Sequence, residues 1–103
     1  MTTYEVIRKE NESLIEVKGH AGFGPHGEDI VCSAISTACI MTATLIDKMK
    51  EKRYNILDAV CEEGYFRLQV NTSDIVIRDI FDNLVDTLDA LQKEYPAYLK
   101  IKN

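Results

Sequence analysis

Residues Gly19–Ser36 read GHAGFGPHGEDIVCSAIS, and in this stretch a strand pattern gives way to a helix pattern. Four of the five glycines and one of the two prolines of the chain lie here. Such a composition predicts a loop with unusual backbone angles. A helix is expected to begin directly after the loop, near Ile30. The stretch therefore predicts a strand–loop–helix unit around which the other elements are arranged.

On the N-terminal side of this unit, the sequence predicts a β-hairpin. Tyr4–Lys9 and Leu14–Lys18 are rich in β-forming residues, and Glu10–Ser13 between them has the composition of a turn. The second strand of this hairpin runs directly into Gly19 and His20.

On the C-terminal side, apolar residues recur every three or four positions from about Ile30 to Lys52, which predicts an amphipathic helix of about six turns. Its apolar stripe consists of Val31, Ala34, Ile35, Ala38, Cys39, Thr42, Leu45, Ile46 and Met49. Ile40 falls nearly opposite this stripe, so it is expected on an outer face that another subunit covers.

The rest of the chain predicts a second hairpin and a second helix. Ile56–Cys61 and Tyr65–Val70 are the expected strands, and Asn71–Asp74 supplies candidates for the helix N-cap. The stripe of the second helix is Ile77, Ile80, Phe81, Leu84, Leu88, Leu91 and Tyr95, and Pro96 ends it. A short strand is expected within Tyr98–Lys102.

The element order ββαββα indicates an α+β fold, a two-layer sandwich in which both helices cover one face of a largely antiparallel sheet. The 103 residues are enough for one hydrophobic core, so residues 1–103 are expected to form a single domain. The N-terminus has no signal-peptide pattern and the apolar runs are short, which predicts a cytoplasmic protein that does not engage a membrane. The net charge of −5 disfavours nucleic-acid binding and favours a basic protein partner.

Cys32 and His20 are the candidate catalytic pair. Cys32 lies in the first turn of the predicted helix, where the helix dipole and unpaired N–H groups favour a thiolate and can stabilise an oxyanion. His20 follows a strand end, a rigid support that can aim an imidazole at the helix start. Cys39 and Cys61 are interpreted as buried apolar residues, and His26 at the expected loop tip as a solvated histidine without a role.

Asp29 and Ser36 have two interpretations each. Asp29 is placed to cap the helix by accepting the N–H of Val31 or Cys32, or alternatively to orient His20 or a substrate group. Ser36 lies one turn after Cys32 and by default bonds back to the carbonyl of Cys32. Phe23 is a candidate for seating an apolar substrate side chain.

Two rival chemistries are weaker. A phosphate loop is disfavoured because Glu28 and Asp29 place negative charge at the helix start and no Walker lysine is present. A metal site built from His20, His26 and Cys32 with one of these carboxylates matches no common zinc spacing. The sequence therefore points to no metal and no cofactor.

At these residues the chain resembles the bacterial ribosomal-processing cysteine proteases, the Prp family, over essentially its full length. The resemblance rests on Gly19, His20 and Ala21 in the loop, on the run Asp29–Cys32, and on Ser36. It implies that His20 is the catalytic histidine and Cys32 the nucleophile, with Gly19, Asp29 and Ser36 as supporting positions.

The resemblance also implies a task. Members of the family remove a short N-terminal extension from a large-subunit ribosomal protein, cut after paired aromatic residues and form homodimers. Two alternatives remain open from the residues alone. One is a non-catalytic module that binds a ribosomal protein or another peptide, with Cys32 buried, and the other is a metal-binding or redox-sensing protein that uses the same cysteine.

Overall fold

The computed structural model describes residues 1–49 and 55–103. The elements follow the predicted order, with the expected short strand at the end: β1 (Thr2–Arg8), β2 (Glu12–Lys18), α1 (Ile30–Lys48), β3 (Ile56–Glu62), β4 (Tyr65–Asn71), α2 (Ile75–Glu94) and β5 (Leu99–Ile101). Helix α1 ends at Lys48 with Met49 as its C-cap, earlier than the predicted end near Lys52, and residues 50–52 themselves lie outside the described residues. Asp74 is the N-cap of α2, and its side chain accepts the N–H of Val76.

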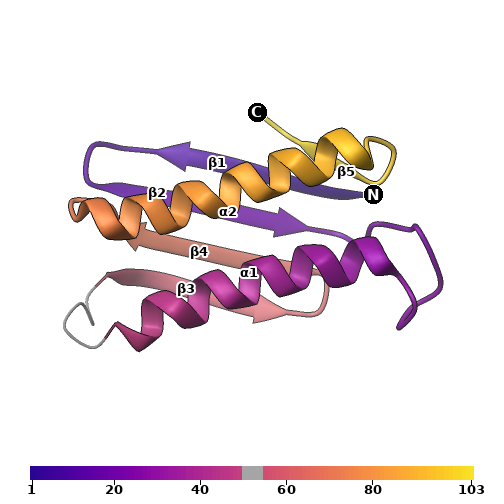
Figure 1. Ribbon diagram of the computed structural model, residues 1–103, viewed down its shortest axis with the longest axis horizontal. Coiled ribbons are helices and arrows are strands. Elements are labelled where there is room, and N and C mark those ends of the chain that lie inside the picture. The colour runs from indigo at the N-terminus through magenta and orange to yellow at the C-terminus, as the bar shows by residue number, and fades with distance from the viewer. Residues whose placement is uncertain (50–54) are drawn as a thin grey trace.

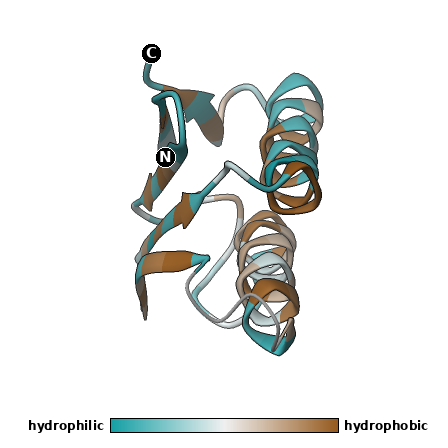
Figure 2. Cartoon of the chain, turned by 90° about the vertical axis from the view of Figure 1, so that its left-hand side faces the viewer, coloured by the Kyte–Doolittle hydropathy of each residue, from teal (hydrophilic) through white to brown (hydrophobic). Residues whose placement is uncertain are grey.

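The strands form one sheet in the order β3-β4-β2-β1-β5. Neighbouring strands are antiparallel except for β5, which pairs with β1 in parallel. Both helices lie on the same face of the sheet, one beside the other (Figure 1, Figure 2). The predicted two-layer α+β sandwich is confirmed.

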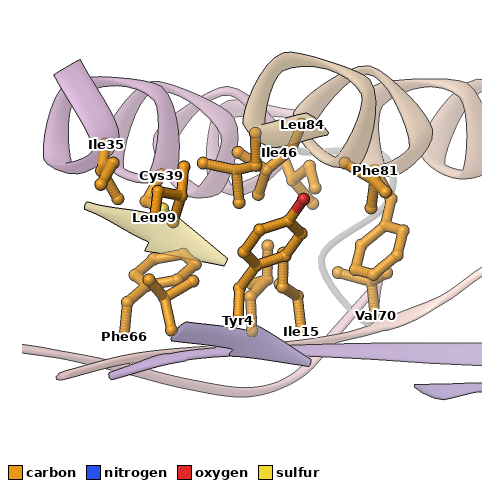
Figure 3. Close-up of a cluster of buried hydrophobic side chains, with 14 of the residues drawn as sticks. Tyr4, Ile15, Ile35, Cys39, Ile46, Phe66, Val70, Phe81, Leu84 and Leu99 are labelled. Carbon is orange, nitrogen blue, oxygen red and sulfur yellow. The ribbon is translucent and has the colours of Figure 1, made fainter. Parts of the chain in front are cut away.

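The core fills the space between the sheet and the helices (Figure 3). Tyr4, Val17 and Phe66 are register partners on β1, β2 and β4, and all three are buried. From the other layer come the buried faces of α1 and α2, which contribute Val31, Ile35, Cys39, Ile46, Ile77, Phe81, Leu84, Val85 and Leu88. Each helix turns one apolar face to the sheet, and burial of that face fixes how the helix lies on the sheet.

Helix α1 carries more apolar surface than the core covers. Leu45, predicted to lie in the apolar stripe, is 50% exposed, so this part of the prediction is wrong. The helix packs near the β3 edge of the sheet (Figure 1). Its buried residues recur every three or four positions and so form one stripe: Val31, Ile35, Cys39, Thr42 and Ile46. Among the described residues, α1 is long and apolar enough to cross a membrane by length and composition alone, and a core helix meets the same criterion.

Candidate active site

Three segments that are far apart in the sequence meet at one end of the sheet. β2 ends there, α1 begins there, and the turn between β3 and β4 lies beside them (Figure 1). A cleft of about 560 Å³ opens between α1 and this turn. The residues selected from the sequence all line the cleft, so the fold brings the five of them together: Gly19, His20, Asp29, Cys32 and Ser36.

Cys32 lies in the first turn of α1 and is partly buried. Its Sγ accepts a hydrogen bond from the backbone N–H of Ala21, with a nitrogen–sulfur distance of 3.1 Å. The donor belongs to the glycine-rich loop, directly after His20. A backbone N–H aimed at the sulfur stabilises negative charge on it, which is what a cysteine nucleophile requires.

Asp29 joins the helix to the loop. One oxygen, Oδ1, accepts the N–H groups of Val31 at 3.0 Å and Cys32 at 2.9 Å, and the other, Oδ2, accepts those of Phe23 at 2.8 Å and Gly24 at 3.2 Å. These bonds, above all the one from Cys32, hold the pKa of the Asp29 carboxyl below its usual value. The predicted N-cap is confirmed. Among the described residues, the hydrogen bonds of the carboxylate all come from backbone N–H groups, so the alternative in which Asp29 orients His20 has no support in this geometry.

The expected oxyanion donors at the helix start are already engaged. The N–H groups of Val31 and Cys32 bond to the Asp29 side chain, and that of Ser33 bonds to the Asp29 carbonyl at 3.0 Å. The sequence-based expectation is therefore wrong for these groups. It failed because the same aspartate that begins the helix uses the donors that the helix start would otherwise offer.

His20 is exposed and lies between the loop and the β3–β4 turn. Its ring meets that of His26 edge to face, with centroids 6.2 Å apart. His26 in turn has its Nε2 3.2 Å from Oε1 of Glu63. His26 is exposed as expected, but neither of these contacts was predicted, and nothing local in the sequence links the loop to Glu63.

Gly19 and Ser36 occupy different parts of the site. Gly19 has φ +91°, and an added Cβ would lie 2.7 Å from the carbonyl oxygen of Met1, so a side chain does not fit there. Its N–H bonds to the carbonyl of Gly64 at 2.9 Å. Ser36 is exposed to the cleft one turn after Cys32, and the expected bond from its hydroxyl to the Cys32 carbonyl is not among the hydrogen bonds of the described residues.

The family model for the cysteine protease Prp matches residues 1–100. The chain belongs to the Prp family of cysteine proteases. Solved structures are similar over nearly the whole chain. The ribosomal processing protease Prp of Staphylococcus aureus with a covalently linked product peptide has 22% identity and a TM-score of 0.84, and covers 98% of this chain and 97% of its own.

Two further structures have the same fold. The S. aureus protease with a substrate peptide has 18% identity and a TM-score of 0.78, covering 99% of this chain and 98% of its own. The protein SMU.848 of Streptococcus mutans has 23% identity and a TM-score of 0.74, covering 99% and 92%. No curated protein matches the sequence.

The three cysteines of this Prp-family protease differ in their surroundings. Cys39 is 2% exposed, and burial raises the pKa of its thiol to about 12. Cys61 was expected to be buried but is exposed, and this prediction is wrong. It pairs with Phe66 and so faces the helix layer, but β3 is the edge strand and the cleft lies above it.

Two apolar residues of the protease, Phe23 and Ile40, also lie in other places than expected. Phe23 does not line the cleft; its ring packs edge to face on Tyr95 and Tyr98, with centroids 5.7 and 5.1 Å away. The expectation that Phe23 seats a substrate side chain is therefore not supported, and its place is that of an anchor for the loop. Ile40 is 45% exposed and lines the cleft, two turns along α1 from Cys32.

The residues of the proposed metal site are not arranged around a common point. Within residues 1–49 and 55–103, no group of three or more His, Cys, Asp and Glu side chains is placed to hold a metal ion. Asp29 faces backbone donors and His26 faces Glu63. The non-catalytic alternative is also not retained, because the chain belongs to a protease family and Cys32 lines an open cleft.

Proposed function

We propose that this protease removes a short N-terminal extension from a large-subunit ribosomal protein by cutting after aromatic residues. The similar S. aureus enzyme is a ribosomal processing protease that has been solved with substrate and product peptides. The net charge of −5 suits a basic substrate, which it attracts at low salt. The same charge repels nucleic acid, so the protein substrate is the proposed partner, and the cytoplasm is the proposed place of action.

The contact between Ala21 and Cys32 carries the proposal. A backbone N–H pointing at a partly exposed sulfur, in a cleft that also contains a histidine, is an arrangement suited to a nucleophile. A structural cysteine needs neither the donor nor the opening.

The mechanism that we propose is acyl transfer. His20 takes the proton of the Cys32 thiol, and the sulfur attacks the scissile carbonyl carbon, forming a carbon–sulfur bond. His20 then gives the proton to the leaving amine as the carbon–nitrogen bond breaks. Water, deprotonated by His20, hydrolyses the thioester, which releases the acid product and restores the thiol.

The oxyanion donors are proposed to come from the glycine-rich loop. The N–H of Ala21 donates to the sulfur, and in the proposed mechanism the sulfur becomes negatively charged when His20 takes its proton. As the carbon–sulfur bond forms, the negative charge moves from the sulfur to the adjacent carbonyl oxygen. A backbone N–H beside the sulfur can then donate its hydrogen bond to this oxygen instead. Each donor of this kind contributes about 3 kcal/mol in comparable sites.

The cleft offers a seat for an apolar side chain. Ile35 and Phe66 lie at its base, and Cys61 and Ile40 border it on the two sides. A largely apolar pocket of this kind is typical of subsites for aromatic side chains. The row Cys32, Ser36 and Ile40 runs along α1, so an extended peptide is proposed to follow the helix from the nucleophile outward.

A homodimer is part of the proposal, because α1 exposes apolar side chains on its outer face. Met41 is 66% exposed and Leu45 50% exposed, and Leu57 on β3 is 48% exposed. Such surfaces mark interaction sites. Sedimentation of the protein and of its Met41→Asp variant tests this, and a monomeric parent protein would contradict it.

Substitution of Cys32 tests the proposed function. Cys32→Ala and Cys32→Ser are expected to abolish cleavage of a peptide with paired aromatic residues, while fold and peptide binding remain. Cys61→Ser is the matched control, because Cys61 lines the same cleft and, within residues 1–49 and 55–103, no backbone N–H donates to its sulfur. Equal cleavage by the Cys32 variants and the parent protein would refute the proposed protease mechanism. Cleavage by the parent protein with no preference for aromatic residues would refute the proposed specificity.

A further inference from the structure

The turn between β3 and β4 lies directly against His20. An ideal Cβ built on Gly64 would be 3.0 Å from Nε2 of His20, 3.4 Å from its Cε1 and 3.6 Å from its Cδ2. The absent side chain of Gly64 thus leaves the space that the Nε2 end of the imidazole occupies. His20 is 44 positions away in the sequence, so this contact is made by the tertiary fold alone.

The backbone of the same turn fixes the chain around His20. The carbonyl of Gly64 accepts the N–H of Gly19 at 2.9 Å, which ties down the residue immediately before the histidine. The neighbouring Glu63 pairs with His26 at 3.2 Å, and the His26 ring faces that of His20. The turn therefore touches the loop before His20, at His20 and beyond it.

We infer that Gly64 is a positioning residue for His20: its carbonyl holds the chain before the histidine, and its lack of a side chain sets where the imidazole rests. The inference builds on the proposed role of His20 as general base. A base that is displaced by a fraction of an ångström loses alignment with the thiol, because proton transfer needs hydrogen-bond distance.

Turn geometry offers a competing reason for the glycine. Gly64 has φ +73°, a conformation that favours glycine in a two-residue turn whatever lies beside it. Gly27 separates the two reasons, because it has φ +86° and nothing within 4 Å of an added Cβ. Gly27→Ala introduces backbone strain only. Gly64→Ala introduces the same kind of strain and also places a Cβ 3.0 Å from Nε2 of His20.

The test is a double-mutant cycle on thermal stability. Gly64→Ala is expected to lower the melting temperature of the parent protein more than that of His20→Ala, where the ring is gone and only the backbone strain remains. Gly27→Ala is expected to lower the melting temperature equally in both backgrounds. If Gly64→Ala also acts equally in both, the turn alone explains the glycine and the inference is wrong.

Kinetics supply the second measurement. Gly64→Ala is expected to lower kcat for peptide cleavage about tenfold or more with little change in KM, and to alter the pH dependence of Cys32 alkylation in the direction of His20→Ala. Unchanged kcat would overturn the inference. If Gly64→Ala does not fold, Gly64→Asn replaces it, since asparagine tolerates positive φ but still carries a Cβ. Failure of the parent protein to cleave any peptide would refute the proposed function. The stability cycle would in that case still show whether Gly64 sets the position of the His20 ring.

Discussion

The backbone N–H of Ala21 donates a hydrogen bond to Sγ of Cys32 over 3.1 Å. The two residues belong to different elements, one to the glycine-rich loop and the other to α1, so the bond exists only when the loop lies over the helix start. Asp29 keeps the loop there, because its carboxylate binds N–H groups on both sides. The nucleophile and its nearest donor are thus held by one capping residue.

The three cysteines are expected to differ in alkylation. At pH 6, Cys32 should react fastest with iodoacetamide because of its backbone donor and the histidine in the same cleft. Cys61 is exposed and should react more slowly than Cys32, and Cys39 should not react, because burial raises its pKa to about 12 and keeps it protonated. Labelling followed by peptide mapping measures the rates, and Cys61→Ser removes the exposed competitor. Faster labelling of Cys61 than of Cys32 at this pH would contradict the assignment of the nucleophile.

His20→Ala is expected to lower peptide cleavage by about 10²- to 10⁴-fold, the usual contribution of a general base. His26→Ala should have a much smaller effect, because its contact with Glu63 joins two side chains that are 80% and 70% exposed. Cleavage rates with and without a chelator provide the measurement. Equal losses from both variants, restored by added zinc, would favour the metal site instead.

Asp29→Asn is expected to keep the helix cap and to loosen the loop. The amide oxygen can still accept from Val31 and Cys32, but its NH₂ group then faces the donors of Phe23 and Gly24. Amide hydrogen exchange should therefore speed up at Phe23 and Gly24 more than at Val31. Exchange that is unchanged at Phe23 would show that the carboxylate does not hold the loop.

The parent protein should also lose stability in acid through Asp29. The folded-state pKa of this carboxyl lies below its ordinary value of about 3.9. Its contribution to stability is therefore present above pH 4 and is lost as the pH falls through the lower, folded-state pKa. The melting temperature of Asp29→Asn should be lower than that of the parent at pH 7, and the gap should narrow below pH 4. A gap that stays constant down to pH 2 would exclude this linkage.

Phe23→Ala is expected to destabilise the protein by about 1 kcal/mol, because aromatic pairs contribute roughly this much beyond their buried area. The ring packs on Tyr95 and Tyr98, so its loss frees the loop from the end of α2. Phe23→Leu is the matched control, because it keeps an apolar contact without the aromatic ring. Its stability should lie between those of the parent protein and Phe23→Ala. Urea unfolding measures all three proteins, and an unaltered midpoint in Phe23→Ala would exclude the anchor role.

Local patterns in the sequence were enough to predict the elements and the fold class. Strand alternation, the helix stripes and the cap candidates Asp29 and Asp74 act over a few residues, so they can be read without the rest of the chain. The same holds for Cys32 at a helix start. Long-range contacts could not be predicted in this way: the exposure of Cys61, the half-exposed Leu45 and the packing of Phe23 on Tyr95 and Tyr98 all depend on which elements become neighbours.

The candidate nucleophile and histidine, the capping aspartate and the glycine-rich loop could all be predicted from the sequence, because each is defined by residue type and local spacing. The cap that Asp29 makes on the helix is local and was predicted, but the N–H of Ala21 reaches the sulfur of Cys32 only in the folded chain. The fold likewise places the Gly64 turn against His20. The pairing of β3 with β4, and of β4 with β2, brings a distant turn to the end of β2, and no local sequence pattern encodes that register.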